Sequence, residues 1–178
     1  MEKGLVLIIT GNGKGKTTAA MGTAIRSLGW GRKVLIIQFL KSEDMESGET
    51  EFLKDQKLEF YTTGIGFSWT KSHEEQLESI KKAWNFAKEK MMDKSYDLII
   101  LDEIINIFNI KDFDVSNVIT EDELIKVINE RPDKNNDIIL TGRGASQKLI
   151  EFADTVSEVR EIKHAYRKGI KAKKGIEY

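Results

Sequence analysis

The chain contains no cysteine, so disulfides, thiolate metal sites and cysteine nucleophiles are all excluded. Any metal site must use oxygen ligands or one of the two histidines. A hard cation held by oxygen atoms is therefore the metal that this composition favours.

Long apolar runs are missing as well. No stretch reaches the roughly 18 apolar residues that cross a bilayer. Residues 1–4 lead directly into a short strand-like segment instead of a signal peptide. We therefore expect a soluble, cytoplasmic protein with no membrane partner.

An excess of one charge sign is also absent. The 28 basic and 29 acidic residues leave a formal charge of −1, so no broad positive field steers the protein toward a nucleic-acid backbone. We expect no nucleic-acid partner. A local basic excess lies near the C-terminus, where such a run is usually a solvated face; it consists of Lys163, Arg167, Lys168, Lys171, Lys173 and Lys174.

The pattern of apolar residues predicts one α/β domain over residues 1–178. Short β-branched runs predict strands at 5–9, 34–39, 58–62, 98–101, 138–141 and 155–159. Helical spacing and capping residues predict helices at 17–28, 72–91, 120–131 and 146–154. Capping boxes are predicted for Ser72 with Glu75 and for Thr120 with Glu123. This alternation indicates a mostly parallel sheet with helices on both faces, and ligands bind such sheets at the carboxyl ends of the strands.

A glycine-rich run between the first strand and the first helix has the context of a phosphate-binding loop. Glycines let backbone N–H groups surround phosphate oxygens, a lysine adds positive charge, and a threonine hydroxyl can bind magnesium. A glycine-rich turn without a ligand is the alternative. The run comprises Gly11, Asn12, Gly13, Lys14, Gly15, Lys16, Thr17 and Thr18.

The spacing of this loop departs from the usual one. The pattern G-x-x-x-x-G-K-[ST] requires glycine at position 10, where the chain has Thr10, and Gly11 comes one residue late. The loop is effectively one residue shorter, and Lys14 adds a second cation. This departure weakens the case for an ordinary hydrolase or kinase.

A second candidate site follows the apolar strand at 98–101, which ends in Asp102 and Glu103. A carboxylate in this position, opposite a phosphate loop, is expected to serve Mg²⁺. Neighbouring strand residues point to opposite sides, so we expect one of the two to face the metal. The alternative is an acidic helix N-terminus.

These motifs resemble the ATP:corrinoid adenosyltransferases of the cobalamin pathway, also called cob(I)yrinic acid a,c-diamide adenosyltransferases. The resemblance extends along the whole chain as an ordered set of short segments. They are GNGKGKTTAA at 11–20, QF and K within 38–41, GE at 48–49, GIGFSW at 64–69, LDE at 101–103, RP at 131–132, LTGR at 140–143, AD at 153–154, KH at 163–164, GIKA at 169–172 and GIE at 175–177.

The resemblance implies a RecA-like P-loop NTPase fold, a homodimer and Mg²⁺-ATP bound in reversed orientation. It implies a corrinoid substrate (cobalamin, cobinamide or cobyrinic acid diamide), an electron-donor flavoprotein and tripolyphosphate as leaving group. Reduced Co(I) would itself attack the ribose C5′, so the protein's task is positioning and charge stabilisation. Many members begin with an N-terminal arm over the corrinoid, whereas here the first predicted strand starts by about Leu5.

The resemblance also implies roles for individual residues. Lys16, Thr17 and Glu103 correspond to polyphosphate and magnesium groups, and Arg26 to a nucleotide contact. Phe67 and Trp69 correspond to an aromatic pair that displaces the lower axial ligand of the corrinoid. Their alternative role is a hydrophobic staple before the helix at 72–91.

Three further predictions concern single residues. Arg143, which follows a strand, contacts phosphate or corrinoid, or else caps a turn. His164 is a candidate corrinoid contact, although a lone histidine is more often structural. Trp30 and Trp84 are predicted to pack in the interior.

Two other functions remain open at this point. A P-loop ATPase or small-molecule kinase would share the phosphate loop and the acidic strand end, but would release orthophosphate or ADP. A module that binds corrinoid or nucleotide without chemistry would show no turnover.

Overall fold

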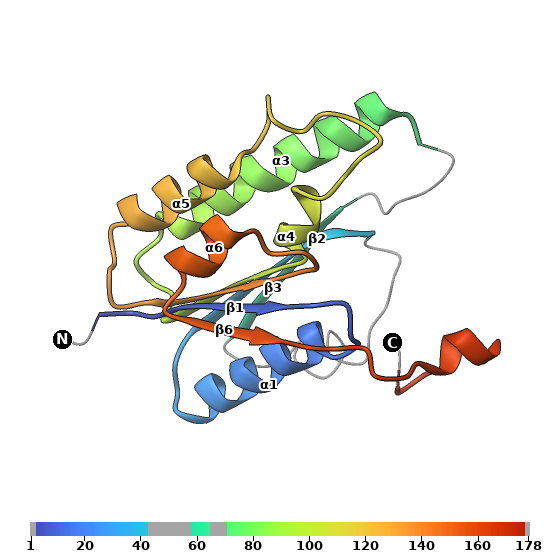
Figure 1. Cartoon of the computed structure of the whole chain (residues 1–178). Coiled ribbons are helices and arrows are strands. Elements are labelled where there is room, and N and C mark those ends of the chain that lie inside the picture. The colour runs from blue at the N-terminus through green and yellow to red at the C-terminus, as the bar shows by residue number, and fades with distance from the viewer. Residues whose placement is uncertain (1–2, 43–57, 65–70, 177–178) are drawn as a thin grey trace.

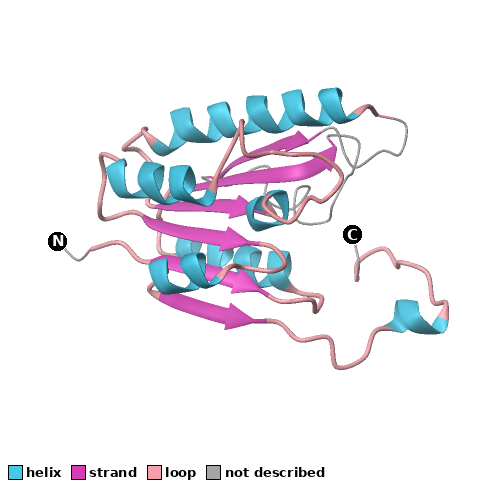
Figure 2. Ribbon diagram, turned by 45° about the horizontal axis from the view of Figure 1, so that its top comes forward, coloured by secondary structure: helices cyan, strands magenta, loops and turns pink. Residues whose placement is uncertain are grey.

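All six predicted strands are present in one parallel sheet. The computed structural model describes residues 3–42, 58–64 and 71–176. The strands lie in the order β3-β2-β4-β5-β1-β6, and every pairing between them is parallel. Figure 2 shows their arrowheads at one edge of the sheet. Their bounds are β1 Val6–Thr10, β2 Val34–Ser42, β3 Leu58–Gly64, β4 Leu98–Asp102, β5 Asp137–Thr141 and β6 Thr155–Glu158.

Helices cover both faces of this sheet, as the alternating pattern predicts (Figure 1). Helix α1 packs on one face, and α3, α4, α5 and α6 lie on the other. Among the described residues, no helix has the length and apolar content that crossing a membrane requires. The bounds are α1 Lys16–Gly29, α3 His73–Met91, α4 Ile104–Ile107, α5 Glu121–Glu130, α6 Gln147–Phe152 and the 3₁₀ helix η1 Ala165–Lys168.

The core is divided into two layers by strand alternation. Ile36 and Ile100 face α1, whereas their neighbours Leu35 and Leu101 face the opposite helices, and all four are fully buried. The central strands are therefore apolar on both sides, as expected for a parallel sheet between two helical layers.

Side-chain caps start the helices on the larger layer. The Ser72 hydroxyl accepts from the Glu75 amide, and the Glu75 carboxylate accepts from the Ser72 amide, which confirms the predicted capping box. The hydroxyls of Thr120 and Ser146 cap α5 and α6, each accepting from the amide three residues later. The predicted box at Thr120 is only half formed, because the Glu123 carboxylate accepts from Trp84 and Lys88 instead. Helix α5 ends at Glu130, directly before Arg131, as predicted.

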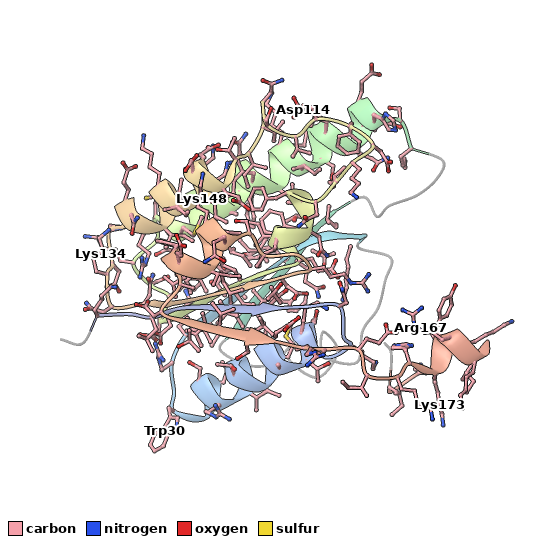
Figure 3. The ribbon with its side chains drawn as sticks, in the orientation of Figure 1. Trp30, Asp114, Lys134, Lys148, Arg167 and Lys173 are labelled. Atoms are coloured by element: carbon pink, nitrogen blue, oxygen red, sulfur yellow. The ribbon has the colours of Figure 1, made fainter. Side chains whose placement is uncertain are left out.

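The structure corrects one packing prediction and adds two short helices. Trp84 is buried as predicted, but Trp30 is 84% exposed. Helix α1 ends at Gly29, and Gly31 turns the chain with a φ of 76°, so the Trp30 indole points into solvent (Figure 3). The additional elements are α4 and η1, which lack the length that makes helical periodicity visible.

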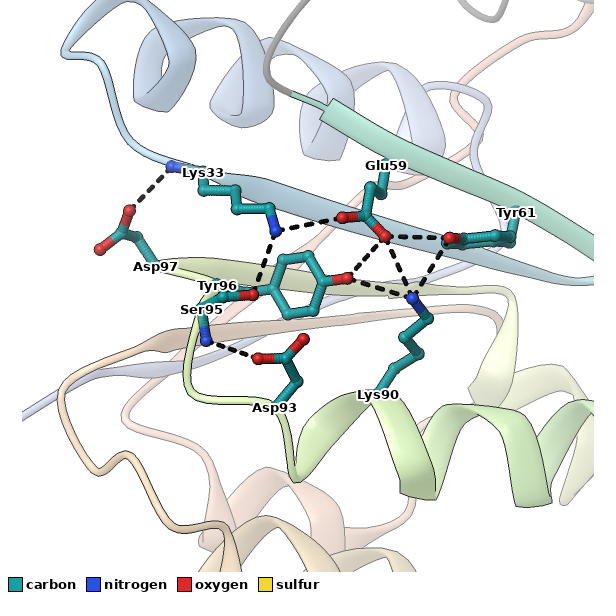
Figure 4. A network of polar contacts seen from close by, with 8 residues as sticks. All are labelled: Lys33, Glu59, Tyr61, Lys90, Asp93, Ser95, Tyr96 and Asp97. Atoms are coloured by element: carbon teal, nitrogen blue, oxygen red, sulfur yellow. Dashed lines mark hydrogen bonds and ion pairs between the residues drawn. The ribbon is translucent and has the colours of Figure 1, made fainter.

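A polar network closes the amino end of the sheet (Figure 4). The carboxylate of Glu59, at the start of β3, accepts from the hydroxyls of Tyr96 at 2.6 Å and Tyr61 at 2.9 Å. It also pairs with the ammonium groups of Lys33 and Lys90, each at 3.1 Å. These contacts join β3, α3 and the segments that precede β2 and β4.

Candidate functional site

Four polar side chains lie level with one another near the carboxyl edge of the sheet, three of them at strand ends and the fourth, Gln38, within β2 in register with Asp102. They are buried, although the strands that carry them are otherwise apolar. Because parallel strands end at the same edge, these side chains come together without being near one another in the sequence. They are Thr10 on β1, Gln38 on β2, Asp102 on β4 and Thr141 on β5.

Asp102 lies at the centre of this edge and joins three elements. Its carboxylate accepts from the hydroxyls of Thr141 at 2.6 Å and Thr17 at 3.0 Å, and from the Gln38 amide at 2.8 Å. Thr17 belongs to the first turn of α1, so this contact connects the acidic strand end to the phosphate loop. Such a connection is what the sequence predicts for a loop and a carboxylate that serve one polyphosphate.

Glu103, the second predicted carboxylate, has a different environment. Its backbone is left-handed, with a φ of 65°, and its amide donates to the Thr141 hydroxyl at 2.9 Å. Burial and the adjacent Asp102 raise the pKa of Glu103, while Lys41, Arg143 and Lys16 oppose that rise. Glu103 therefore lies among cations, whereas Asp102 is held by neutral donors.

The phosphate loop places its lysine at the start of α1. Gly15 has a φ of 116°, and the helix begins at Lys16. The Lys16 ammonium donates to the Gly13 carbonyl at 2.7 Å. Burial and the nearby Arg143 guanidinium lower the pKa of Lys16, so its charge is incompletely compensated within the protein. A polyphosphate would supply the missing negative charge.

The loop that carries Arg143 is held by the short helix α4 and the residues after it. The Arg143 amide donates to Asn106 Oδ1 at 2.6 Å, and Asn109 Nδ2 donates to the Arg143 carbonyl at 2.9 Å. Gly142 lies so close to Ile105 that a Cβ there would come within 2.7 Å of that side chain. The guanidinium is thereby brought into the field of Lys16 and Glu103.

Four residues that shape this site have no role predicted from the sequence. Gln38 and Thr141 hold Asp102, and Asn106 and Asn109 hold the Arg143 loop. A polar residue that follows an apolar run, after residues 34–37 in β2 and after residues 138–140 in β5, was the available signal for the first two. The two asparagines follow a segment without clear periodicity, and only the fold brings them to Arg143.

Two of the predicted site residues, Arg26 and His164, have other surroundings. Arg26 is exposed in the last turn of α1, ten residues and thus about 15 Å along the axis from Lys16. His164 caps η1, because its Nδ1 accepts from the Tyr166 amide at 3.1 Å. Phe67 and Trp69 lie outside the described residues.

The remaining loop residues differ in exposure. Asn12, Lys14 and Thr18 are exposed, whereas Gly13 is buried. The Lys14 ammonium donates to the Ile176 carbonyl, so the end of the C-terminal segment returns to the phosphate loop. The loop therefore has one open side and one side covered by protein.

The donor set fits a cation that arrives with phosphate better than a cation held by protein alone. Within residues 3–42, 58–64 and 71–176, no three histidine or acidic side chains are grouped so that they could hold a metal. The Thr17 hydroxyl and the carboxylates of Asp102 and Glu103 are oxygen groups, and Mg²⁺ binds proteins through one or two such groups together with water and substrate phosphates.

The whole chain is similar to one family of known proteins. Residues 2–178 match the family described as ATP:corrinoid adenosyltransferase BtuR/CobO/CobP. The corrinoid adenosyltransferase of Escherichia coli K12 is 39% identical over 178 residues, which is 99% of this chain and 87% of that protein. The corresponding proteins of Salmonella typhimurium and Pseudomonas aeruginosa are 37% and 36% identical, each over 99% of this chain and over 87% and 85% of their own lengths.

Among solved structures, the fold is similar to that of the RadB recombinase. The TM-score is 0.55 at 15% sequence identity, and the match covers 90% of this chain and 76% of that one. At this identity the similarity concerns the fold alone. It confirms the predicted RecA-like P-loop architecture.

Proposed function

The chain belongs to the ATP:corrinoid adenosyltransferase family, and from this premise we propose how its residues carry out the reaction. It is an enzyme that uses ATP to adenosylate corrinoids. The proposal concerns the leaving group, the metal and the residues that hold them.

The proposed step is a displacement at the ribose C5′ of ATP. The Co(I) centre of the corrinoid supplies the electron pair for the new Co–C5′ bond. The C5′–O bond breaks, and its electrons leave with the triphosphate oxygen, so the products are adenosylcorrinoid and tripolyphosphate. No protein nucleophile is required.

The protein's part is to hold the triphosphate and stabilise the charge that develops on it. We assign this task to Lys16 and Arg143, with the exposed Lys14 at the loop's edge. Preorganised cations of this kind lower the barrier because they need not reorganise during the reaction. Mg²⁺, held by Thr17 with Glu103 or Asp102, would supply further neutralisation of the polyphosphate.

One observation carries this proposal: the 3.0 Å hydrogen bond between Thr17 of the loop and Asp102 of β4. This bond supports the proposal because it joins the phosphate loop to the acidic strand end, so one bound triphosphate would contact both. Since Lys16 is adjacent to Thr17 and Glu103 is adjacent to Asp102, the cation and both carboxylates share that location.

Phe67 and Trp69 are proposed to act on the corrinoid and not on ATP. Support for this role comes from the family resemblance. Displacing the lower axial ligand makes Co(II) four-coordinate and easier to reduce. Alanine variants at either position should therefore suppress the electron paramagnetic resonance signal of four-coordinate Co(II), while ATP affinity and folding persist. A native signal in both variants would remove this role, and loss of folded protein would favour the staple.

The proposal includes three points that the family resemblance supports. The enzyme works as a homodimer, receives electrons from a flavoprotein and is located in the cytoplasm. Whether it serves synthesis or salvage depends on its preferred corrinoid.

An anaerobic assay with ATP, Mg²⁺, cobalamin or cobinamide and a strong reductant tests the reaction. We expect a light-sensitive alkyl-cobalt spectrum and one tripolyphosphate for each adenosylcorrinoid. Orthophosphate or ADP as product would instead indicate an ATPase or kinase. Binding of both substrates without turnover would indicate a binding module.

A further inference from the structure

The chain segment that follows β6 lies directly against the phosphate loop. The Gly13 amide donates to the Val159 carbonyl at 2.7 Å, and the Val159 amide donates to the Thr10 carbonyl at 2.8 Å. These bonds extend the β1–β6 pairing beyond the last registered pair, Thr10 with Glu158. One amide of the loop is therefore bonded to protein before any phosphate arrives.

The same segment leaves no room for a side chain at position 13. A Cβ on Gly13 would lie 2.8 Å from the Arg160 carbonyl carbon and 2.8 Å from the Val159 oxygen. Both are backbone atoms, which cannot rotate away as the end of a side chain can. Gly13 has no positive φ between +20° and +160°, so space alone, and not conformation, requires glycine there.

The other two loop glycines have different constraints. Gly11 combines a φ of 97° with a Cβ position only 2.4 Å from the Val159 oxygen. Gly15 has a φ of 116° and open space around its Cβ position. Gly15 is thus needed for the turn into α1, whereas Gly13 is needed because the chain after β6 lies close behind it.

We propose that the backbone of Val159 and Arg160 is a positioning element for the nucleotide, which we call the splint. It contacts the loop on the side away from its open face. Because the Gly13 amide donates to Val159, that amide is not available to bind phosphate. The loop's shape is then present before substrate binds, so less ordering entropy is lost on binding. Val159 and Arg160 act through the loop and do not touch substrate.

A competing explanation is that Gly13 is glycine because a phosphate oxygen must approach it. Both explanations predict that Gly13→Ala weakens polyphosphate binding, so affinity alone does not separate them. They differ in the free protein, where only the splint protects the Gly13 amide. The polyphosphate part of the test rests on the proposed function, and the free-protein part does not.

Hydrogen exchange of the ¹⁵N-labelled full chain, followed by NMR, makes the first test. In the free protein, the Gly13 amide should exchange about 100-fold more slowly than in an unfolded chain. Adding Mg²⁺ and tripolyphosphate should leave that rate unchanged while slowing exchange at Lys16 and Thr17. Fast exchange at Gly13 in the free protein, with protection appearing only on adding tripolyphosphate, would overturn the splint.

Gly13→Ala and Gly22→Ala form a matched pair for the second test. Gly22, in α1, also lacks a positive φ but has nothing within 4 Å of its Cβ position. In Gly13→Ala, the Val159 amide should exchange about tenfold faster without ligand, and the Kd for tripolyphosphate should rise about tenfold. Gly22→Ala should change neither. Native exchange at Val159 in a folded Gly13→Ala protein would refute the proposal.

The two tests separate failure of the splint from failure of the proposed function. If Gly13→Ala does not fold, the exchange rates of the wild-type protein decide alone. If the enzyme releases orthophosphate instead of tripolyphosphate, the reaction assignment is wrong. The exchange rate of the Gly13 amide in the free protein then still tests the splint, because that measurement does not depend on the reaction.

Discussion

The two ends of the sheet carry the same kinds of side chain but use them in opposite ways. At the amino end, the Glu59 carboxylate pairs with two lysines and accepts from two tyrosines (Figure 4). At the carboxyl end, Lys16 and Arg143 lie near Asp102 and Glu103. Both ends thus combine cations with carboxylates.

The pKa shifts at the two ends have opposite signs. The hydrogen bond from Tyr96, with those from the lysines and Tyr61, lowers the pKa of Glu59 to about 2. Although burial opposes it, hydrogen bonding to Tyr61, Glu59 and Tyr96 raises the pKa of Lys90. At the carboxyl end, burial raises the pKa of Glu103 and lowers that of Lys16.

From this difference we infer that the amino end stabilises the fold and that the carboxyl end is the ligand site. A carboxylate with a lowered pKa and a lysine with a raised pKa are charges that the fold favours. Glu103 and Lys16 are charges that the fold disfavours, and a polyphosphate with its cation would relieve both. Perturbed groups of this second kind are concentrated at functional sites.

Among the variants that test this difference between the two ends, removal of Lys16 should have the largest effect. We expect Lys16→Ala to lower turnover about 10³-fold, because a preorganised cation on the polyphosphate is lost. The thermal midpoint should change little, since the fold gains little from this charge. The measurements are the anaerobic adenosylation rate at saturating ATP and a thermal melt.

Lys148→Ala is the matched control for that experiment. Lys148 pairs with Asp122 on the surface, and its side chain is 50% exposed. It belongs to α6 and is not part of the phosphate loop. It should retain native turnover. Near-native turnover of Lys16→Ala would show that the phosphate loop has been wrongly assigned.

Substitutions of the two adjacent carboxylates should have different effects, one on stability and the other on magnesium dependence. Asp102→Asn replaces an acceptor that binds Thr17, Gln38 and Thr141, so we expect a loss of about 2 kcal/mol in the free energy of unfolding. Glu103→Gln should instead weaken the magnesium dependence of turnover and raise the thermal midpoint, because it removes a disfavoured charge. Magnesium titrations of the rate and thermal melts distinguish the two variants.

The gain from Glu103→Gln should depend on pH in a defined direction. The folded-state pKa of Glu103 is raised, so the wild-type protein loses stability as the pH rises from the ordinary value of 4.5 through the raised value. The variant's advantage should therefore be small below pH 4.5 and full above that window. Greater magnesium sensitivity in Asp102→Asn would mean that Asp102 is the metal-facing carboxylate.

Breaking the amino-end network should affect stability without affecting chemistry. For Glu59→Gln we expect a loss of about 1 kcal/mol at neutral pH and an unchanged kcat. Because the folded-state pKa is lowered, the wild-type advantage is present above the ordinary value of 4.5 and declines as the pH falls toward about 2. Denaturant titrations across that range measure it, and a changed kcat would contradict the division between the two ends.

The smallest effect is expected at Trp30. Its indole is 84% exposed at the end of α1, so Trp30→Ser should alter the free energy of unfolding by less than about 0.5 kcal/mol. A urea titration checks this value. A loss comparable to that of a buried tryptophan, for which Trp84→Ala is the reference, would mean that Trp30 packs against protein.

Local signals in the sequence were sufficient for the strands, the longer helices and the identity of the site motifs. The strand at 98–101 is recognisable because a central parallel strand must be apolar on both faces. The helix from Ser72 is recognisable because its capping box and the helical spacing of its apolar residues predict the same element. The phosphate loop is recognisable because few structures require glycines followed by Lys16 and Thr17. The family resemblance added the reaction.

Tertiary structure alone decided which groups meet. Nothing near Asp102 in the sequence indicates that Thr17, Gln38 and Thr141 bind it, because strand order, and not chain order, sets those neighbours. The exposure of Trp30 likewise depended on the direction in which the chain leaves α1, which the predicted helix end did not give. Gly13 illustrates both contributions. The sequence shows that it belongs to the glycine-rich loop, but the backbone that leaves no room for a side chain there includes the carbonyl of Val159, 146 residues away.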